Sequence, residues 1–176
     1  MALNKPKKLD GEALKAYAVR LLSGRALSVG ELKAKLRARA EDSAQIEPLI
    51  AQLKDYGYLN DSRFAEHFAG SRASSGAFGR QRVLSDLLRK KVAPKVAEQA
   101  VGAAFQGVDE ATRVEEYLQR KFRGKNLATL LKEPKTLASV YRRLRTAGFG
   151  SGASIRALKR FASQAEELEG MEETGE

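Results

Sequence analysis

The chain has 176 residues, of which 43% are hydrophobic and 31% are charged, and it contains no cysteine. This composition favours a folded chain over a disordered one and excludes disulfides and thiolate metal sites. Because no run of about 18 apolar residues and no signal-peptide pattern occurs, we expect no membrane segment and a cytoplasmic protein. The formal charge of +10 divides into +16 over residues 1–165 and −6 over residues 166–176. The basic part favours polyanionic partners, and a generally solvated surface is the alternative.

The amino-terminal part predicts a basic arm and then a unit of three helices. Residues 1–9 lack apolar periodicity and predict a flexible arm. Asp10 is placed to cap a first helix, and Ser28 with Glu31 forms a capping box for a second. Apolar residues recur at helical spacing in each helix. The unit spans residues 10–58.

A joint between two helical units is predicted where the third helix of this unit ends. That helix starts near Asp42, and Gly57 follows its last apolar residue, as is typical of a helix that ends in a left-handed residue. Tyr58 is expected to pack back on the last turn. Asn60 or Asp61 then caps the next helix, so we expect a tight joint.

The second unit is predicted over residues 59–107. Phe64 and Phe68 fall on the core stripe of its first helix, and Pro94 opens its last helix at a tolerated first-turn position. Apolar positions of the first unit recur here after about 50 residues.

The third unit is predicted over residues 108–165. An extra short turn is expected between its first two helices, and its last joint, at Gly148, repeats the pattern of Gly57 in a looser form. Residues 166–176 contain only acidic charges and predict a disordered tail.

No stretch alternates apolar and polar residues over enough positions to predict a strand. The fold class is therefore all-α, with three tandem three-helix-bundle repeats in an elongated, curved array. Such a body could follow the groove of a larger helical object.

Motifs at the helix ends cover residues 13–101. They are Ala18-x-x-Leu21-Leu22-x-x-Arg25-x-x-Ser28-x-x-Glu31-Leu32-x-x-Lys35-Leu36, then Leu53-x-x-x-Gly57-Tyr58-Leu59 with Arg63-Phe64-Ala65 and Arg72, then Gly79-x-x-Arg82-Val83-x-x-Asp86-Leu87-x-x-Lys90. Together they resemble the RecX family, whose members regulate the RecA recombinase. Asn60 stands where the family more often has aspartate, and Lys91 stands where a glycine is common.

The resemblance implies tandem three-helix repeats that dock along the groove of the RecA filament. It implies inhibition of the RecA ATPase and of strand exchange, and a block of filament extension or loss of the filament, in recombination, DNA repair and the SOS response. The implied partner is the RecA recombinase filament, and we expect single- or double-stranded DNA to be contacted at its backbone without sequence preference. We expect a monomer.

The residues provide no catalytic or metal site. His67 is the single histidine and is interpreted as a partly exposed helix residue. Neighbouring carboxylates point apart on a helix, and the glycines of residues 148–152 lack the lysine of a phosphate-binding loop. We therefore expect no enzyme, no metal and no cofactor.

Basic residues gather in groups along the second and third units. The candidate partner- or DNA-binding residues are Arg72, Arg80, Arg82, Arg89, Lys90, Lys91, Arg142, Arg143, Arg156, Lys159 and Arg160. Arginine suits bidentate contacts with phosphate or carboxylate, although each residue alone is equally consistent with a solvated helix face. No platform for stacking bases is predicted, and the tyrosines at positions 56, 58 and 141 are expected to pack at joints.

Two other functions fit the same residues. A nonspecific DNA- or RNA-binding helical module that acts without a recombinase needs only the basic charge. An adaptor for some other acidic protein is the third interpretation. Retention of the recombinase after nuclease treatment would favour the filament regulator.

Overall fold

The protein is all-helical in the computed structural model, which describes residues 8–107 and 109–171. Ten α-helices and two 3-10 helices form within these ranges, and the one β-bridge found there joins Leu9 to Ala40. None of the described helices combines the length and the apolar character needed to cross a membrane. The all-α prediction is confirmed.

The chain divides into two compact units. The first contains Met1–Phe68 and Leu87–Ala100, and the second contains Ala69–Asp86 and Val101–Glu176. The division passes through α4 (Asp61–Ser75), α5 (Arg80–Arg89) and α6 (Pro94–Ala104). Since both units take residues from the predicted second repeat, the division into three repeats stays a prediction.

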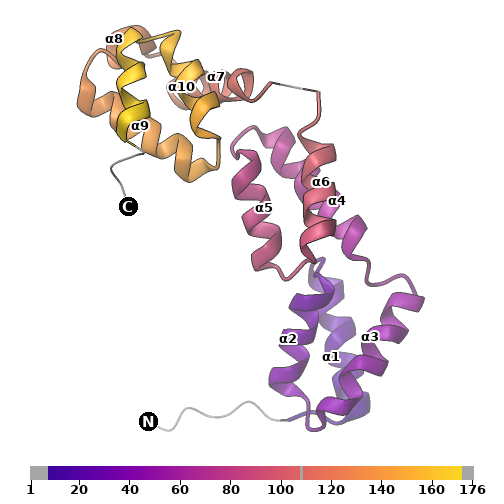
Figure 1. Cartoon of the computed structure of the whole chain (residues 1–176). Helices are drawn as coiled ribbons and strands as arrows, with labels where there is room; N and C mark the ends of the chain where they lie inside the picture. Colours follow the sequence, from indigo (N-terminus) through magenta and orange to yellow (C-terminus); the bar gives the residue numbers. More distant parts are fainter. Residues whose placement is uncertain (1–7, 108, 172–176) are drawn as a thin grey trace, which may run out of the picture. The chain divides into compact units, whose positions relative to one another are not determined.

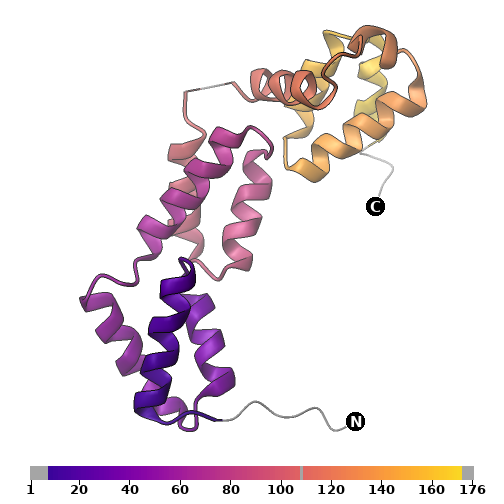
Figure 2. The same cartoon turned by 180° about the vertical axis from the view of Figure 1, so that it is seen from behind.

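Three helices lie side by side at the start of the first unit (Figures 1 and 2). They are α1 (Gly11–Gly24), α2 (Val29–Arg39) and α3 (Ile46–Asp55), and the short 3-10 helix η1 (Ser43–Gln45) precedes α3. Asp10 accepts a hydrogen bond of 3.0 Å from the Ala13 N–H, and Ser28 and Glu31 complete the capping box of α2. The predicted caps are confirmed.

The core between these helices is aliphatic. Its fully buried large side chains are Leu14, Leu32, Leu36, Ile46 and Ile50. Each such side chain stabilises the fold by roughly 1.5–3 kcal/mol. The backbone of Leu9 is tied to this bundle, because its N–H donates to the Arg39 carbonyl at 2.8 Å and its carbonyl accepts from the Glu41 N–H at 2.9 Å. The predicted flexible arm is therefore wrong at Leu9, and residues 1–7 lie outside the described ranges.

An exposed ion pair connects α2 to α3. Lys33 Nζ lies 2.6 Å from Glu47 Oε2, and this hydrogen bond lowers the pKa of the Glu47 carboxyl. A carboxyl with a lowered pKa stabilises the folded state at neutral pH and loses that contribution only on acidification through its folded pKa. Because Glu47 is exposed, the contribution is small.

The joint after α3 closes on a left-handed glycine, as predicted. Gly57 has φ of 74°, and the Tyr58 N–H donates to the Leu53 carbonyl at 2.9 Å. Asn60 caps α4 by accepting from the Arg63 N–H at 2.9 Å. The expected packing of Tyr58 on the last turn is wrong, because its side chain is 64% exposed.

The amino terminus of α2 binds to the start of α4 and to the turn after α5. Asp61 does not cap its own helix. Its Oδ1 accepts a 2.8 Å hydrogen bond from the Val29 N–H, which is one of the free amides at the start of α2. The buried Ser28 hydroxyl donates to the Lys90 carbonyl. These bonds fix α2 against two elements that are distant in sequence.

Gly30 allows this close approach. A Cβ atom at Gly30 would lie 2.6 Å from the Lys91 carbonyl oxygen and closer still to the Lys91 Cβ. Lys91 itself has φ of 61°, the left-handed conformation that a glycine would adopt without strain. Lys91 therefore holds a strained backbone conformation at the point where the turn after α5 meets α2.

Asp61→Ala is expected to lower the free energy of unfolding by about 1 kcal/mol, because the Val29 N–H loses its cap. Asp61→Asn should retain most of that stability, since its amide oxygen can still accept the bond. Urea unfolding followed by circular dichroism measures both variants. Equal losses for alanine and asparagine would show that the hydrogen bond does not carry the effect.

Helices α4–α6 bury small and branched residues on one face each. The buried set is Ala65, Ala69, Ala73, Val83, Leu87, Ala97, Ala100 and Val101. Phe64 and Phe68 are only partly buried, so their assignment to the core stripe is wrong. The alanines beside them take the core positions of α4.

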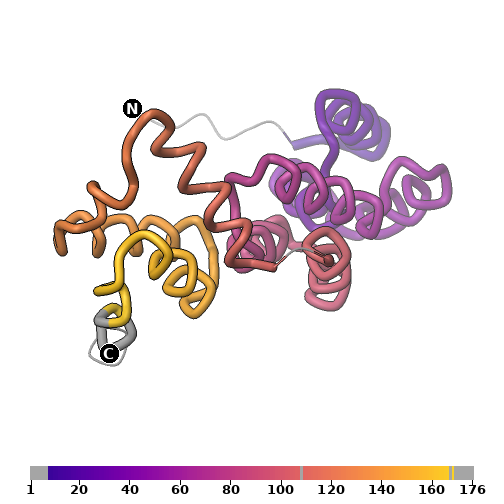
Figure 3. The backbone as a smooth tube through the Cα atoms, turned by 90° about the horizontal axis from the view of Figure 1, so that it is seen from above, coloured from indigo at the N-terminus to yellow at the C-terminus, as the bar shows by residue number. Residues whose placement is uncertain are grey.

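The second unit ends in four α-helices and a 3-10 helix. They are α7 (Glu110–Lys121), α8 (Leu127–Leu130), α9 (Pro134–Ala147), α10 (Ser151–Lys159) and η2 (Ser163–Met171). Helix α10 packs against α7, α9 and η2, and Figure 3 shows α7–α10 gathered into one group. The short α8 confirms the extra turn predicted between α7 and α9.

The joint at Gly148 is tight, which corrects the looser form predicted for it. Gly148 has φ of 91°, and its carbonyl accepts from the Gln81 N–H at 3.1 Å. The Ala147 carbonyl accepts from the Gly79 N–H at 2.8 Å. The next residue, Phe149, is 1% exposed, and its ring lies 5.4 Å from the Tyr117 ring. Glycine at position 148 therefore allows the backbone of residues 79–81 to approach closely.

The acidic tail begins in ordered structure. Helix η2 continues to Met171, and Leu168 is 3% exposed in the core of this unit. The prediction of disorder from Glu166 onward is thus wrong for residues 166–171. Residues 172–176 lie outside the described ranges.

Candidate functional site

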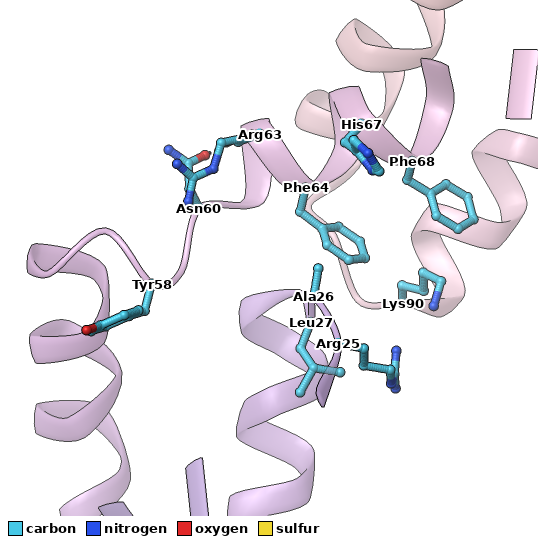
Figure 4. Close-up of a pocket in the computed structure, with 10 residues that line it drawn as sticks. All are labelled: Arg25, Ala26, Leu27, Tyr58, Asn60, Arg63, Phe64, His67, Phe68 and Lys90. Atoms are coloured by element: carbon cyan, nitrogen blue, oxygen red, sulfur yellow. Dashed lines mark hydrogen bonds between the residues drawn. The ribbon is translucent and has the colours of Figure 1, made fainter. Parts of the chain in front are cut away.

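A groove of about 550 Å³ opens on the first unit (Figure 4). It lies between the loop that joins α1 to α2, the start of α4 and the residue that follows α5. Its apolar and aromatic lining consists of Ala26, Leu27, Tyr58, Phe64 and Phe68. Its polar lining consists of Arg25, Asn60, Arg63, His67 and Lys90. Neither set includes a carboxylate, so a ligand that suits the groove is apolar in part and negatively charged.

Two phenylalanines form the aromatic wall of the groove. The rings of Phe64 and Phe68 are stacked, with centroids 6.2 Å apart and planes inclined by 17°. They lie four residues apart on α4, which places both on one face of the helix. In Figure 4 the Phe64 ring points toward Ala26 and Leu27. The groove therefore has an aromatic wall formed by α4, which the sequence did not predict.

Basic side chains border this wall. Lys90 Nζ lies 6.0 Å from the centroid of the Phe64 ring and 5.5 Å from that of Phe68. Glu31 Oε1 is 3.4 Å from Lys90 Nζ and 3.4 Å from Arg25 Nη2, so a single carboxylate faces two cations. Arg63 donates from Nη2 to the Gly57 carbonyl at 2.9 Å and is otherwise exposed. The border keeps a net positive charge.

An exposed tyrosine pair stands at the edge of the groove, and Tyr58 of this pair belongs to the groove lining. Tyr56 and Tyr58 are each 64% exposed, and their rings meet edge to face at 6.4 Å. Their predicted packing at the joint is wrong, whereas Tyr141 is buried as predicted. Exposed tyrosines are frequent in protein contacts, because the ring gives apolar area at low entropic cost.

Three of the predicted basic residues gather in the second unit. Arg82 and Arg143 line a shallow groove of about 420 Å³ together with Phe78. The Arg72 guanidinium lies 4.3 Å from the centroid of the Phe78 ring. Arg82 also pairs with Asp86 at 3.1 Å. This arrangement brings arginines from α4, α5 and α9 around one aromatic ring.

The predicted basic residues in α10 and at its carboxyl end face acidic partners. Arg156 lies 3.7 Å from Asp109, Lys159 lies 3.0 Å from Glu166, and Arg160 lies 2.8 Å from Glu115. These ion pairs lower the positive field at α10 without removing the charges, since five of these six side chains are at least one-third exposed. The pattern of the sequence did not predict this pairing.

Four predicted residues are exposed on helices or turns. They are Arg80, Arg89, Lys91 and Arg142. Arg89 and Lys91 flank Lys90 in the first unit, whereas Arg80 and Arg142 belong to the second. Of the predicted set, only Lys90 lines the groove of the first unit.

Sequence reasoning missed Arg25 and Arg63 as members of a site. A usable signal was present, because a basic residue followed by phenylalanine occurs at Arg63–Phe64 and again four residues later at His67–Phe68. Because residues four apart share a helix face, this repeat places Phe64 and Phe68 on one face of α4 and Arg63 and His67 on the adjacent face.

The arrangement suits binding of a ligand. His67 is exposed on α4, as predicted. No group of histidine, aspartate and glutamate able to hold a metal occurs among residues 8–107 and 109–171.

Comparison with known proteins places this chain among regulatory proteins. A family model described as "RecX, second three-helix domain" matches residues 60–101. The "Regulatory protein RecX" of Serratia proteamaculans is 34% identical over 158 residues, which cover 77% of this chain and 90% of that protein. The protein of the same name from Syntrophotalea carbinolica is 29% identical over 134 residues, covering 76% and 86%.

A solved structure shows the same fold. The "Crystal structure of regulatory protein RecX" matches with a TM-score of 0.64 at 16% identity, and covers 84% of this chain and 72% of the other. The relatives have the name of a regulatory protein, which agrees with a chain that is not an enzyme. On the match to the Serratia protein, this chain belongs to the RecX family of regulatory proteins.

Proposed function

We propose that this protein inhibits the RecA recombinase by binding the RecA–DNA filament. On this proposal it modulates the filament's ATPase, strand exchange and extension during recombination, DNA repair and the SOS response. Membership of the RecX family is the observation that carries the proposal. On the same proposal, the protein acts as a monomer and contacts the backbone of single- or double-stranded DNA.

The charge distribution supports a polymeric, negatively charged partner. The +16 of residues 1–165 is spread over both compact units, and exposed arginines occur on α5 and α9. Several weak contacts along a repetitive partner add up to a useful affinity through high effective concentration. The proposal includes three tandem repeats in an extended array, and the family model at residues 60–101 falls within the second of them.

Arg142 and Arg143 are proposed contacts in the second unit. Both are exposed on α9, so Arg142→Gln with Arg143→Gln should preserve the fold and weaken inhibition of DNA-dependent ATP hydrolysis by RecA several-fold. Lys132→Gln with Lys135→Gln is the matched control, because it removes the same charge from exposed positions of the same unit. An ATPase rate that stays unchanged at equimolar wild-type protein would contradict the proposal.

The second candidate is a nonspecific nucleic-acid-binding module that acts without a recombinase. The net charge of +10 favours it, since it requires only counterion release. Immobilised protein is incubated with purified RecA filament, with and without nuclease. RecA retained after nuclease treatment supports the regulator, and RecA lost with the DNA supports the module.

A further inference from the structure

We propose that the groove of the first unit is a stacking site for a base of single-stranded nucleic acid. The base lies against Phe64, and the phosphates on either side of it contact Arg25, Arg63 and Lys90. This inference rests on the part of the proposed function that brings the chain to DNA. It concerns the protein alone, so it is tested without a recombinase.

The buried positions of α4 are filled without the two phenylalanines. Ala65 and Ala69, one residue after each ring, are 0% exposed and take the buried positions of α4. Phe64 and Phe68 remain partly exposed and line the groove. Parallel aromatic rings in an open groove are a stacking surface that any base can use.

The cations are placed for a chain of phosphates. In Figure 4, Arg63 lies on one side of Phe64, and Arg25 and Lys90 lie on the other. A base within a strand likewise has a phosphate on each side. Arg63 uses Nη2 for the Gly57 carbonyl, and its Nη1 and Nε remain able to donate. The single negative charge of Glu31 balances only one of the two positive charges that face it, those of Arg25 and Lys90.

The lining favours a nucleotide over an acidic peptide. A flat aromatic ring with cations on two sides matches alternating bases and phosphates, whereas a peptide has no flat group at regular spacing. Asn60 uses its Oδ1 to cap α4, so its amide group is left to donate to a base edge. An acidic peptide is the alternative that the experiment tests.

The experiment compares two fluorescein-labelled strands by anisotropy: a short oligothymidylate and the same strand with abasic sites. Both carry the same phosphates, so their difference in affinity measures stacking. Wild-type protein should bind the strand with bases at least about fivefold more tightly, the lower end of the effect of one stacked base. Phe64→Leu should abolish this difference and leave affinity for the abasic strand unchanged.

Two further variants separate stacking from charge. Arg25→Gln should lower the affinity for both strands by the same factor. It should also reduce the slope of log affinity against log salt concentration by about 1. Tyr56→Leu is the matched control, because it removes an exposed aromatic ring that does not line the groove, and it should bind like wild type. Thermal unfolding confirms that each variant is folded. An iodouracil strand should photo-cross-link to the peptide that contains Phe64 and Phe68.

Equal affinity of wild-type protein for both strands would overturn the proposal, and so would absence of binding. An equal loss of affinity for both strands in Phe64→Leu would also overturn it. If a peptide of glutamates around one tryptophan binds more tightly than the oligothymidylate and loses affinity in Phe64→Leu, the groove is a protein site. Failure of these tests leaves RecA inhibition standing, since the ATPase assay measures that separately.

Discussion

Gly148→Ala is expected to lower the free energy of unfolding of the second unit by about 3 kcal/mol. Gly148 has φ of 91°, where a side chain costs roughly 1–2 kcal/mol. A Cβ atom there would also lie 2.8 Å from the Arg82 Cα and closer to the Arg82 nitrogen. Such overpacking costs about 1–3 kcal/mol, because backbone cannot move aside as a flexible side chain does.

Thermal unfolding followed by circular dichroism measures this effect. A loss of about 3 kcal/mol corresponds to a fall in Tm of about 6–12 °C for a chain of this size. Gly124→Ala is the matched control: Gly124 has φ of 78°, but a Cβ atom added there would meet nothing within 4 Å. It should therefore show the backbone strain alone, about 1–2 kcal/mol. If the two variants lose equal stability, the close approach to Arg82 does not matter.

Local signals of the sequence predicted the helix ends correctly. The caps by Asp10 and Ser28 and the left-handed Gly57 depend on residues within a few positions of one another. The short α8 was predicted in the same way, from apolar spacing ahead of Pro134. Interactions of this range can be read from a single sequence.

Contacts between distant segments could not be predicted. Nothing near Gly148 in the sequence reveals that residues 79–82 lie against its backbone. From the sequence alone, the glycines of this joint are therefore interpreted as a loose loop. Asp61 has the sequence of a helix cap, and it caps α2 instead of α4. In both cases the partner lies more than 30 residues away in the sequence.

The candidate site was predicted in part. Charge grouping identified Lys90, but the assignment of Phe64 and Phe68 to the core concealed the aromatic wall beside it. Apolar periodicity gives the face of a helix and not its degree of burial, and on α4 the alanines fill the core. Arg25 joins the site only because the loop between α1 and α2 folds next to α4.

Gly30→Ala is expected to lower the free energy of unfolding of the first unit by about 3 kcal/mol, although alanine normally stabilises a helix. The added Cβ would lie 2.6 Å from the Lys91 carbonyl oxygen, so α2 must move away from the turn after α5. That movement also weakens the Ser28–Lys90 and Val29–Asp61 hydrogen bonds, each contributing about 1 kcal/mol.

Gly70→Ala is the matched control, because Gly70 lies inside α4 and a Cβ atom added to it would have no neighbouring atom within 4 Å. It should be stabilised by about 0.5–1 kcal/mol, the usual effect of this change in a helix. Urea unfolding measures both variants, and hydrogen exchange should show faster exchange at the Val29 amide in Gly30→Ala only.

A second substitution tests the cause. Lys91→Gly removes the Cβ atom nearest to the one added at position 30 and relieves the left-handed strain, so it should recover about 1 kcal/mol in the Gly30→Ala background. Because the clash with the Lys91 carbonyl remains, the recovery should be partial. In Gly30→Ala alone, α2 is held less firmly against α4, so the proposed inhibition of RecA through several simultaneous contacts should weaken as well. If Gly30→Ala were as stable as the wild-type protein, the close contact between α2 and the turn after α5 would be contradicted, and so would the rigid placement of Arg25 beside Phe64.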